Sequence, residues 1–186
     1  MRAATTVRER TLMTARQIDR VIDRLAHQIH EPEDAQIGIV LIGIRRGGEM
    51  LTRRLAAKIE EISGDKLEIG FLNVNLYRDD DVTRPLAESD IHGDLTGKIV
   101  VIVDDVLFTG RTIRSALDAV TDIGRPRVIR LVALVDRGLR ELPIQGDYVG
   151  RFIPTSRRET IAVHLSKTYA ETDRVVLIDD EAIAEG

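Results

Sequence analysis

Two adjacent carboxylates and a short hydroxyl-rich loop are the residues best suited to chemistry. Asp104 and Asp105 follow the apolar run Ile99–Val103, and Thr109-Gly110-Arg111-Thr112 comes next, just before a helical pattern. A glycine allows close backbone approach, and a helix start presents unpaired N–H groups, so this loop predicts an anion cradle. Two acids would repel a bare phosphate, but they suit a ligand that also carries a diol or a divalent metal. A sugar phosphate meets both conditions.

Alternating strand and helix patterns position these residues. A capping box at Thr14–Gln17 opens a helix with apolar residues from Ile18 to Ile29. Two further helices are expected, one at about Glu49–Ile62 and one whose apolar residues between Ile113 and Val120 face the interior. The expected strands are Ile37–Ile44, Leu67–Tyr77, Lys98–Val103 and Val128–Val135, with weaker ones near Tyr148–Phe152, Thr160–Leu165 and Arg174–Ile178. This order predicts an α/β fold with a mainly parallel sheet, which gathers ligands at the carboxyl ends of its strands.

Composition limits the class of protein. The chain has 186 residues, 43% of them hydrophobic, and no cysteine, which excludes a disulfide scaffold, a thiolate metal site and a cysteine nucleophile. The longest apolar run, Ile37–Ile44, is too short to span a bilayer, and the first ten residues lack a signal-peptide core. We therefore expect one domain, residues 1–186, in the cytoplasm, with no membrane partner.

Charge is unevenly distributed along a chain of net charge −4. Residues 111–158 carry ten Arg and Lys against five acids, whereas residues 59–94 carry ten acids against three bases. A basic half beside an acidic segment is compatible with an anion-binding face or with an ordinary solvated surface. Neither a Walker A loop nor a Gly-x-Gly-x-x-Gly fingerprint occurs. The four histidines, His27, His30, His92 and His164, have no spacing typical of a metal site.

The segment Ile99–Thr112 resembles the phosphoribosyl pyrophosphate (PRPP) motif of type I phosphoribosyltransferases: an apolar strand, two acids, and a Thr-Gly-x-Thr loop. The resemblance implies the type I phosphoribosyltransferase fold, a central mainly parallel sheet flanked by helices, with a small hood and a flexible flap loop. It places the flap at approximately 78–96 and the hood mainly at approximately 136–170.

Six further segments make the resemblance narrower, because they occur in the order found in the bifunctional pyrimidine operon regulators with uracil phosphoribosyltransferase activity. They are Leu76–Asp80, Val103–Thr112, Asp122–Pro126, Val135–Gly138, Arg140–Ile144 and Ile153–Ser156. The implied reaction is uracil plus PRPP giving UMP and pyrophosphate, with Mg²⁺ as cofactor. The family also suggests a homo-oligomer, a dimer or larger.

The resemblance assigns roles around the PRPP motif. Asp104 and Asp105 would hold the ribose hydroxyls, with Mg²⁺ held mainly through PRPP, near the two acids. The cradle for the 5′-phosphate would include Val106, Leu107, Phe108, Thr109, Gly110, Arg111 and Thr112. Chemistry would be displacement at the anomeric carbon through an oxocarbenium-like state, so we expect no protein nucleophile.

Two other loops complete the implied site. The pyrophosphate loop would be Gly43–Gly48, where Arg45, Arg46 and Gly47 stand and family members more often have Thr-Arg-Gly; either arginine could supply the missing contact. Tyr77 and Arg78 open the acidic segment that resembles the flap, with Arg78 a catalytic residue. A flap that closes over PRPP would exclude water.

The base would lie under the hood. Asp136 and Arg137, at the end of a strand, would contact it together with the Pro154–Ser156 region, and Ile161 would supply an apolar lid. A salt-bridged turn at Asp136-Arg137 is the alternative interpretation.

The regulatory half of the family function requires a leader mRNA hairpin. Arg24 and His27 match residues that such regulators use. Departures are Asp23 in place of a Thr, Pro32 and Gln145 in place of arginines, and Leu139 in place of a His. Because lost positive charge weakens phosphate affinity, RNA binding stays open. The alternatives are an RNA-binding attenuation regulator that senses PRPP and UMP with little catalysis, and a phosphoribosyltransferase for another nucleobase.

Overall fold

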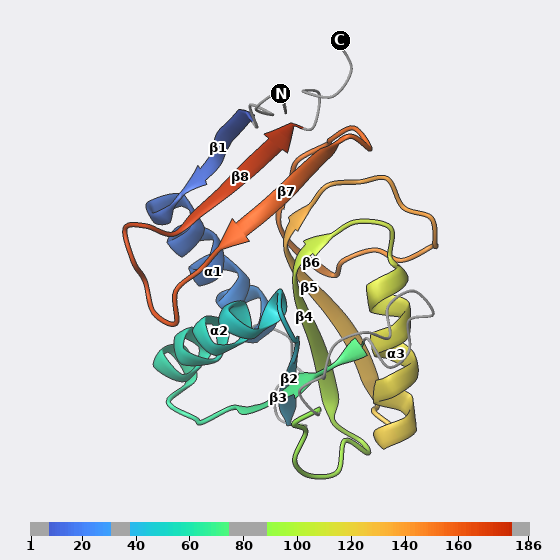
Figure 1. The fold of residues 1–186 in the computed structure, drawn as a ribbon. Coiled ribbons are helices and arrows are strands. Elements are labelled where there is room, and N and C mark those ends of the chain that lie inside the picture. Colours follow the sequence, from blue (N-terminus) through green and yellow to red (C-terminus); the bar gives the residue numbers. More distant parts are fainter. Residues whose placement is uncertain (1–7, 31–37, 75–88, 180–186) are drawn as a thin grey trace.

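The computed structural model describes residues 8–30, 38–74 and 89–179 of the chain, and its elements form two sheets (Figure 1). The larger sheet has five parallel strands in the order β3-β2-β4-β5-β6. Its strands are β2 (Ile39–Ile44), β3 (Glu68–Leu72), β4 (Ile99–Leu107), β5 (Val128–Asp136) and β6 (Tyr148–Phe152). The expected parallel α/β fold is confirmed.

Three helices cover the two faces of this sheet. They are α1 (Ala15–His30), α2 (Gly48–Ser63) and α3 (Arg111–Ile123). Figure 1 shows α1 and α2 on one face and α3 on the other. Each face has its own apolar cluster, which is why the central strands are apolar on both sides.

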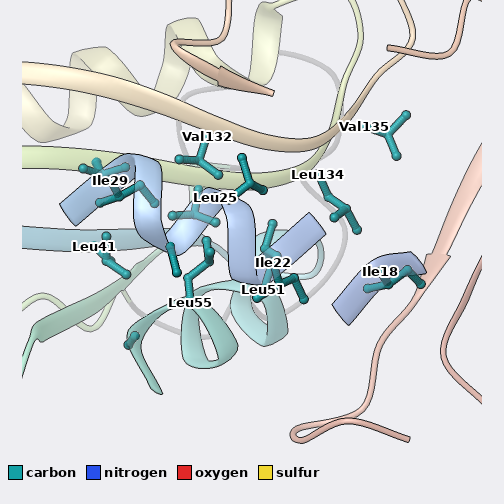
Figure 2. Close-up of a cluster of buried hydrophobic side chains, with 14 of the residues drawn as sticks. Ile18, Ile22, Leu25, Ile29, Leu41, Leu51, Leu55, Val132, Leu134 and Val135 are labelled. Atoms are coloured by element: carbon teal, nitrogen blue, oxygen red, sulfur yellow. The ribbon is translucent and has the colours of Figure 1, made fainter. Parts of the chain in front are cut away.

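The cluster under α1 and α2 fixes how the amino-terminal half packs. Ile22 and Leu25 from α1 meet Leu51 and Leu55 from α2 above the sheet residue Leu41, all of them fully buried (Figure 2). The helical spacing of these residues predicts α1 and α2 well. One half of the expected capping box is present, since Gln17 Oε1 accepts the Thr14 amide at 2.9 Å, whereas the Thr14 hydroxyl donates to the same Gln17 oxygen at 3.3 Å.

A second, antiparallel sheet has the order β1-β8-β7 and lies next to α1 (Figure 1). Its strands are β1 (Arg8–Thr14), β7 (Glu159–His164) and β8 (Arg174–Asp179). The sequence predicts β7 and β8 but misses β1, because Arg8–Thr14 begins with three charged residues, shows no alternation of apolar and polar residues, and buries one side chain, Met13. The range 136–170 expected for the hood thus contains one of these three strands.

Two element boundaries differ from expectation in ways that bear on the site. Strand β4 continues through Asp104 and Asp105 to Leu107, because pairing with β5 extends to Leu107 opposite Asp136. The carboxylates are therefore fixed inside a paired strand, not in a loop. Strand β3 ends at Leu72, and the expected strand residues 75–77 lie outside the described residues.

Candidate active site

Asp104 and Asp105 lie near the carboxyl end of the central strand β4, where Asp104 is buried and Asp105 is partly buried. Asp104 is 7% exposed. The Asp105 amide donates to Asp104 Oδ1 at 3.0 Å, which holds the first carboxylate in a fixed orientation. Burial and the adjacent Asp105 charge raise the pKa of Asp104 well above its ordinary value. Burial also raises the pKa of Asp105. Such a pair gains from hydroxyl donors or a cation.

The turn between β2 and α2 packs directly on this acid pair. A Cβ placed on Gly47 would lie 2.5 Å from Asp105 Oδ1 and 2.9 Å from Asp104 Oδ1. At Gly48 a Cβ would overlap the Val103 carbonyl oxygen. Arg46 has φ +75°, a conformation that non-glycine residues rarely adopt. The two glycines are thus required for the turn to reach the carboxylates.

Among the described residues, the two arginines of this turn, Arg45 and Arg46, form no ion pair with Asp104 or Asp105. Arg45 Nη1 lies 3.7 Å from Glu49 Oε2, and its guanidinium carbon is 5.7 Å from the centre of the Phe71 ring. Its Nε is buried and makes no hydrogen bond within the part of the chain that the structure describes. Arg46 is exposed. Both arginines therefore stand beside the turn with capacity for an anion.

On the other side of the acids, Phe108–Gly110 forms the loop that leads into α3. Gly110, the N-cap residue of α3, adopts φ +91° and makes no side-chain cap. Thr109 Oγ1 accepts the Arg111 amide at 3.3 Å, and Arg111 itself is exposed. The backbone N–H groups at a helix start are a typical binding site for phosphate oxygens. We name Phe108–Thr112 the phosphate loop.

Arg140 is a site residue that the sequence analysis did not single out. Its Nη1 donates to the Phe108 carbonyl at 2.7 Å, and its Nη2 lies 2.5 Å from Asp136 Oδ2. Its Nε donates to the Ile144 carbonyl at 2.8 Å. One side chain thus fixes the phosphate loop, the end of β5 and the following turn. The signal was its place in Arg140–Ile144, a segment that carried the family resemblance without an assigned role.

Asp136 and Arg137 are both engaged by protein groups. Besides its contact with Arg140, Asp136 accepts the Gly138 amide at 2.9 Å through Oδ1. Arg137 Nε donates to Thr155 Oγ1 at 2.8 Å, and its guanidinium carbon lies 4.1 Å from the centre of the Phe108 ring. Burial lowers the pKa of the Arg137 guanidinium. The salt-bridged turn considered as an alternative holds for Asp136, with Arg140 as its partner.

Ile161 lies in the hydrophobic interior. It is 7% exposed, pairs with Leu177 across β7 and β8, and belongs to the apolar cluster that contains Met13 and Val135. Its side chain therefore joins the two sheets. Its expected place over the base stays a prediction.

The ends of the acidic segment lie next to one another. Asp90 pairs with Phe71 through two backbone hydrogen bonds of 2.8 and 2.7 Å, and Ser89 Oγ accepts the Asn73 amide at 3.1 Å. Tyr77, Arg78 and most of the expected flap lie outside the described residues. The described residues on either side of that segment, Asn73 and Ser89, therefore lie next to each other beside the edge strand β3.

Arg24 and His27 lie on the exposed side of α1. Arg24 Nη2 donates to the carbonyls of Val149 and Gly150, at 3.2 and 2.6 Å, and thereby ties α1 to β6. His27 Nδ1 lies 2.9 Å from the Asp23 carbonyl. Pro32, one of the departures from the family pattern, falls outside the described residues.

Comparison with known proteins identifies the family. A family model for the phosphoribosyl transferase domain matches residues 11–168. "Bifunctional protein PyrR" of Streptomyces coelicolor is 51% identical over 162 residues, which cover 85% of this chain and 84% of that protein. The protein of the same name from Pelotomaculum thermopropionicum is 48% identical, over 87% and 91% of the two chains. The chain belongs to the PyrR family of phosphoribosyltransferases.

Solved structures place this PyrR-family chain among the phosphoribosyltransferase folds. The hypoxanthine phosphoribosyltransferase of Trypanosoma cruzi superimposes with a TM-score of 0.71 at 23% identity, covering 91% of this chain and 96% of that one. A hypoxanthine-guanine phosphoribosyltransferase of Bacillus anthracis gives 0.66 at 23% identity, over 89% and 95%. At this identity the likeness establishes the fold. Phosphoribosyl transfer is the activity of the family, and no described helix is long and apolar enough to cross a membrane.

Proposed function

We propose that this protein transfers the 5-phosphoribosyl group of PRPP to N1 of uracil, giving UMP and pyrophosphate. The observation that carries the proposal is the contact between Gly47 and the Asp104–Asp105 pair, with the phosphate loop on the other side of the same acids. This arrangement provides, in sequence along one edge of the sheet, places for a pyrophosphate, a diol and a phosphate.

The acid pair would hold the ribose. The two hydroxyls of PRPP donate to Asp104 and Asp105, which replaces the unfavourable proximity of two buried carboxyl groups with hydrogen bonds to a ligand. The same carboxylates stabilise positive charge on the sugar as the bond to pyrophosphate lengthens. Their fixed place in β4 means that little reorganisation is needed during the reaction.

The two loops would hold the anionic ends. The phosphate loop binds the 5′-phosphate through backbone N–H groups at the start of α3, and Arg111 remains at its rim. The turn at Arg45, Arg46 and Gly47 binds the pyrophosphate. As the C1–O bond to pyrophosphate breaks, the C1–N1 bond to uracil forms and the N1 proton passes to the released pyrophosphate or to solvent water. Arg78 and Tyr77 are proposed to close over the leaving group.

Mg²⁺ fits this donor set as a cofactor bound together with PRPP. When bound, it neutralises the charge of the leaving pyrophosphate. The described residues contain no cluster of three or more His, Cys, Asp or Glu side chains, so the protein would contribute Asp104 and Asp105 while PRPP contributes phosphate oxygens. The base would be surrounded by the carboxyl ends of β4 and β5 and by the loop at 153–158. We further propose that the enzyme is a homo-oligomer and is located in the cytoplasm.

The acceptor is tested by incubating the protein with PRPP, Mg²⁺ and one base at a time: uracil, hypoxanthine, guanine, adenine or orotate. We expect UMP from uracil and no nucleotide from the others. Formation of a purine nucleotide or of orotidine monophosphate would replace uracil as the acceptor. A failure of every base, with PRPP or UMP still bound, would favour the regulator that senses these ligands with little catalysis.

A second function, binding of a leader mRNA hairpin, is proposed because the relatives are named bifunctional and α1 exposes Arg16, Arg20 and Arg24. Asp23 lies among them, and Arg24 is partly engaged by β6. Filter binding of a pyrimidine-operon leader hairpin at rising salt tests this. We expect affinity that falls with salt; equal affinity for an unrelated hairpin would contradict it.

A further inference from the structure

Arg137 lies between two loops that are proposed to bind different groups, one the 5′-phosphate of PRPP and the other the nucleobase. One is the phosphate loop, through the ring of Phe108, 4.1 Å from the guanidinium carbon. The other is the loop Ile153–Arg158, which joins β6 to β7. There Arg137 Nε donates to Thr155 Oγ1 at 2.8 Å, and Nη2 donates to the Ser156 carbonyl at 2.8 Å. Nη2 also donates to the Glu159 carbonyl at 2.5 Å, at the start of β7.

These contacts engage three of the five N–H hydrogens of the Arg137 guanidinium with protein oxygens. The residue is 5% exposed, and the Nε hydrogen and both Nη2 hydrogens already meet protein oxygens. Its own backbone amide donates to the Leu107 carbonyl at 3.0 Å, which fixes Arg137 to the strand that carries the acids. A planar guanidinium that stacks on a ring and forms in-plane hydrogen bonds is a rigid connector.

A second, exposed connection joins the same two loops. Arg111 Nε lies 2.8 Å from Glu141 Oε2, and Arg157 Nη1 lies 3.1 Å from Glu141 Oε1. The two arginine side chains are 64% and 67% exposed, so this connection contributes little on its own. It does show that the loops approach each other at two separate points, one of them buried.

We infer that Arg137 is a positioning residue that couples the two halves of the site: occupation of the phosphate loop sets the loop Ile153–Arg158, and thereby raises affinity for the nucleobase. This inference rests on the proposed function. A 5′-phosphate would hold Phe108 in place, Phe108 would hold the guanidinium, and the guanidinium would hold the backbone at Thr155 and Ser156. Each step is a contact of the described structure except the first.

Hydrogen exchange tests the coupling without catalysis. With PRPP and Mg²⁺ present, we expect exchange in Ile153–Arg158 to slow by about tenfold in the unaltered protein, the factor that about 1.4 kcal/mol represents. In Arg137→Met, PRPP binding measured by calorimetry should stay within about twofold, while the slowing in this loop disappears. Arg151→Met is the matched control, since Arg151 is an exposed arginine of β6 that donates to the Leu12 carbonyl.

Kinetics gives a second readout. Arg137→Met should raise KM for uracil about tenfold and leave the dissociation constant of PRPP within about twofold, and Phe108→Leu should also raise KM for uracil about tenfold. The double variant should be no worse than the poorer single variant, because the two side chains act as one unit. Arg137→Lys keeps the charge over the ring and should recover part of the loss, which also covers the case in which Arg137→Met does not fold.

The outcomes separate this inference from the proposed function. UMP formation without PRPP-dependent slowing of exchange in the loop would overturn the coupling and leave the function intact. The same slowing without UMP formation would overturn the acceptor and support the coupling. Equal slowing in Arg137→Met, or additive losses in the double variant, would also overturn the coupling.

Discussion

The amide of Asp105 donates to the Oδ1 of Asp104 at 3.0 Å, which fixes the Asp104 carboxyl group beside its neighbour. In strand β4, Asp104 is buried and Asp105 is partly buried. Both have raised pKa values because burial disfavours their charged forms, and at Asp104 the neighbouring acid adds to the effect. This arrangement lowers the stability of the folded protein, and it provides a preformed binding site for hydroxyl groups or a cation.

Asp104→Asn should therefore stabilise the ligand-free protein while it reduces turnover by about 10²- to 10³-fold. The raised pKa means that the folded state binds a proton more tightly than the unfolded one. The stability contributed by this group is present below its ordinary pKa of 3.8 and is lost as pH rises through the folded-state value. In thermal denaturation from pH 4 to 8, the melting temperature of the variant should rise relative to that of the unaltered protein as pH increases. A difference in melting temperature that does not change with pH would contradict the assignment.

Two neighbouring glycines allow the turn and the fold to be separated. Gly47→Ala should raise KM for PRPP by roughly tenfold, about 1.4 kcal/mol, because its methyl group would displace the carboxylates of Asp105 and Asp104. Gly48→Ala should instead lower the melting temperature, because its methyl group meets the rigid backbone at Val103. Equal effects of the two substitutions on PRPP binding and on stability would argue against the packing described.

Arg140 should govern the phosphate loop. Arg140→Gln removes donors from the Phe108 and Ile144 carbonyls and a partner from Asp136, so KM for PRPP should rise by about ten- to a hundredfold. Arg114→Gln, which loses an exposed pair with Asp118 on α3, should leave KM within about twofold. Steady-state kinetics with varied PRPP decides, and equal KM values for the two variants would refute the role.

The buried pair of Arg54 and Asp173 should hold the loop before β8 against α2. Arg54 Nη1 lies 2.5 Å from Asp173 Oδ2, and both side chains are nearly inaccessible. Arg54→Met would leave a buried carboxylate without its partner and should cost about 3–5 kcal/mol of unfolding free energy at neutral pH. Lys58→Met, which breaks an exposed pair with Glu61, should cost under about 1 kcal/mol.

The pH dependence of that pair has the opposite sign to that of Asp104. Burial raises the pKa of Asp173, but the amides of Ser166 and Ala170 and the Arg54 guanidinium outweigh it, so the pKa is lowered overall. Its stabilisation is present above its ordinary value of 3.8 and is lost as pH falls through the lowered value. The deficit of Arg54→Met in denaturant titrations should therefore shrink in acid; a deficit that is unchanged at low pH would contradict this.

Periodicity and spacing were sufficient to predict most of the fold. The apolar residues of α1, α2 and the central strands repeat at the spacing their elements require. The Asp-Asp pair lies inside β4, and the Thr-Gly-Arg-Thr segment leads from the loop after β4 into α3. Strand β1 was missed because its burial depends on pairing with β8, more than 150 residues away, and its own sequence shows one buried side chain.

The site was harder to predict where a side chain acts through other protein groups. The hydrogen bonds of Arg137 and Asp136 go to Thr155, Ser156 and Arg140, contacts that depend on how the chain folds after β5. Ile161 pairs with Leu177 and is 7% exposed, and its expected place over the base, like that of Asp136 and Arg137, stays a prediction. The role of Arg140 depends on four carbonyls brought together by the turn after β5.

The central claim is that the Asp104–Asp105 pair and its two flanking loops carry out phosphoribosyl transfer to uracil. The most direct measurement is the yield of UMP and pyrophosphate from PRPP, Mg²⁺ and uracil, with the unaltered protein beside Asp104→Asn/Asp105→Asn. We predict equal amounts of the two products, and their loss in the double variant while its melting temperature is kept or raised. Undiminished UMP formation by a folded double variant would contradict the account.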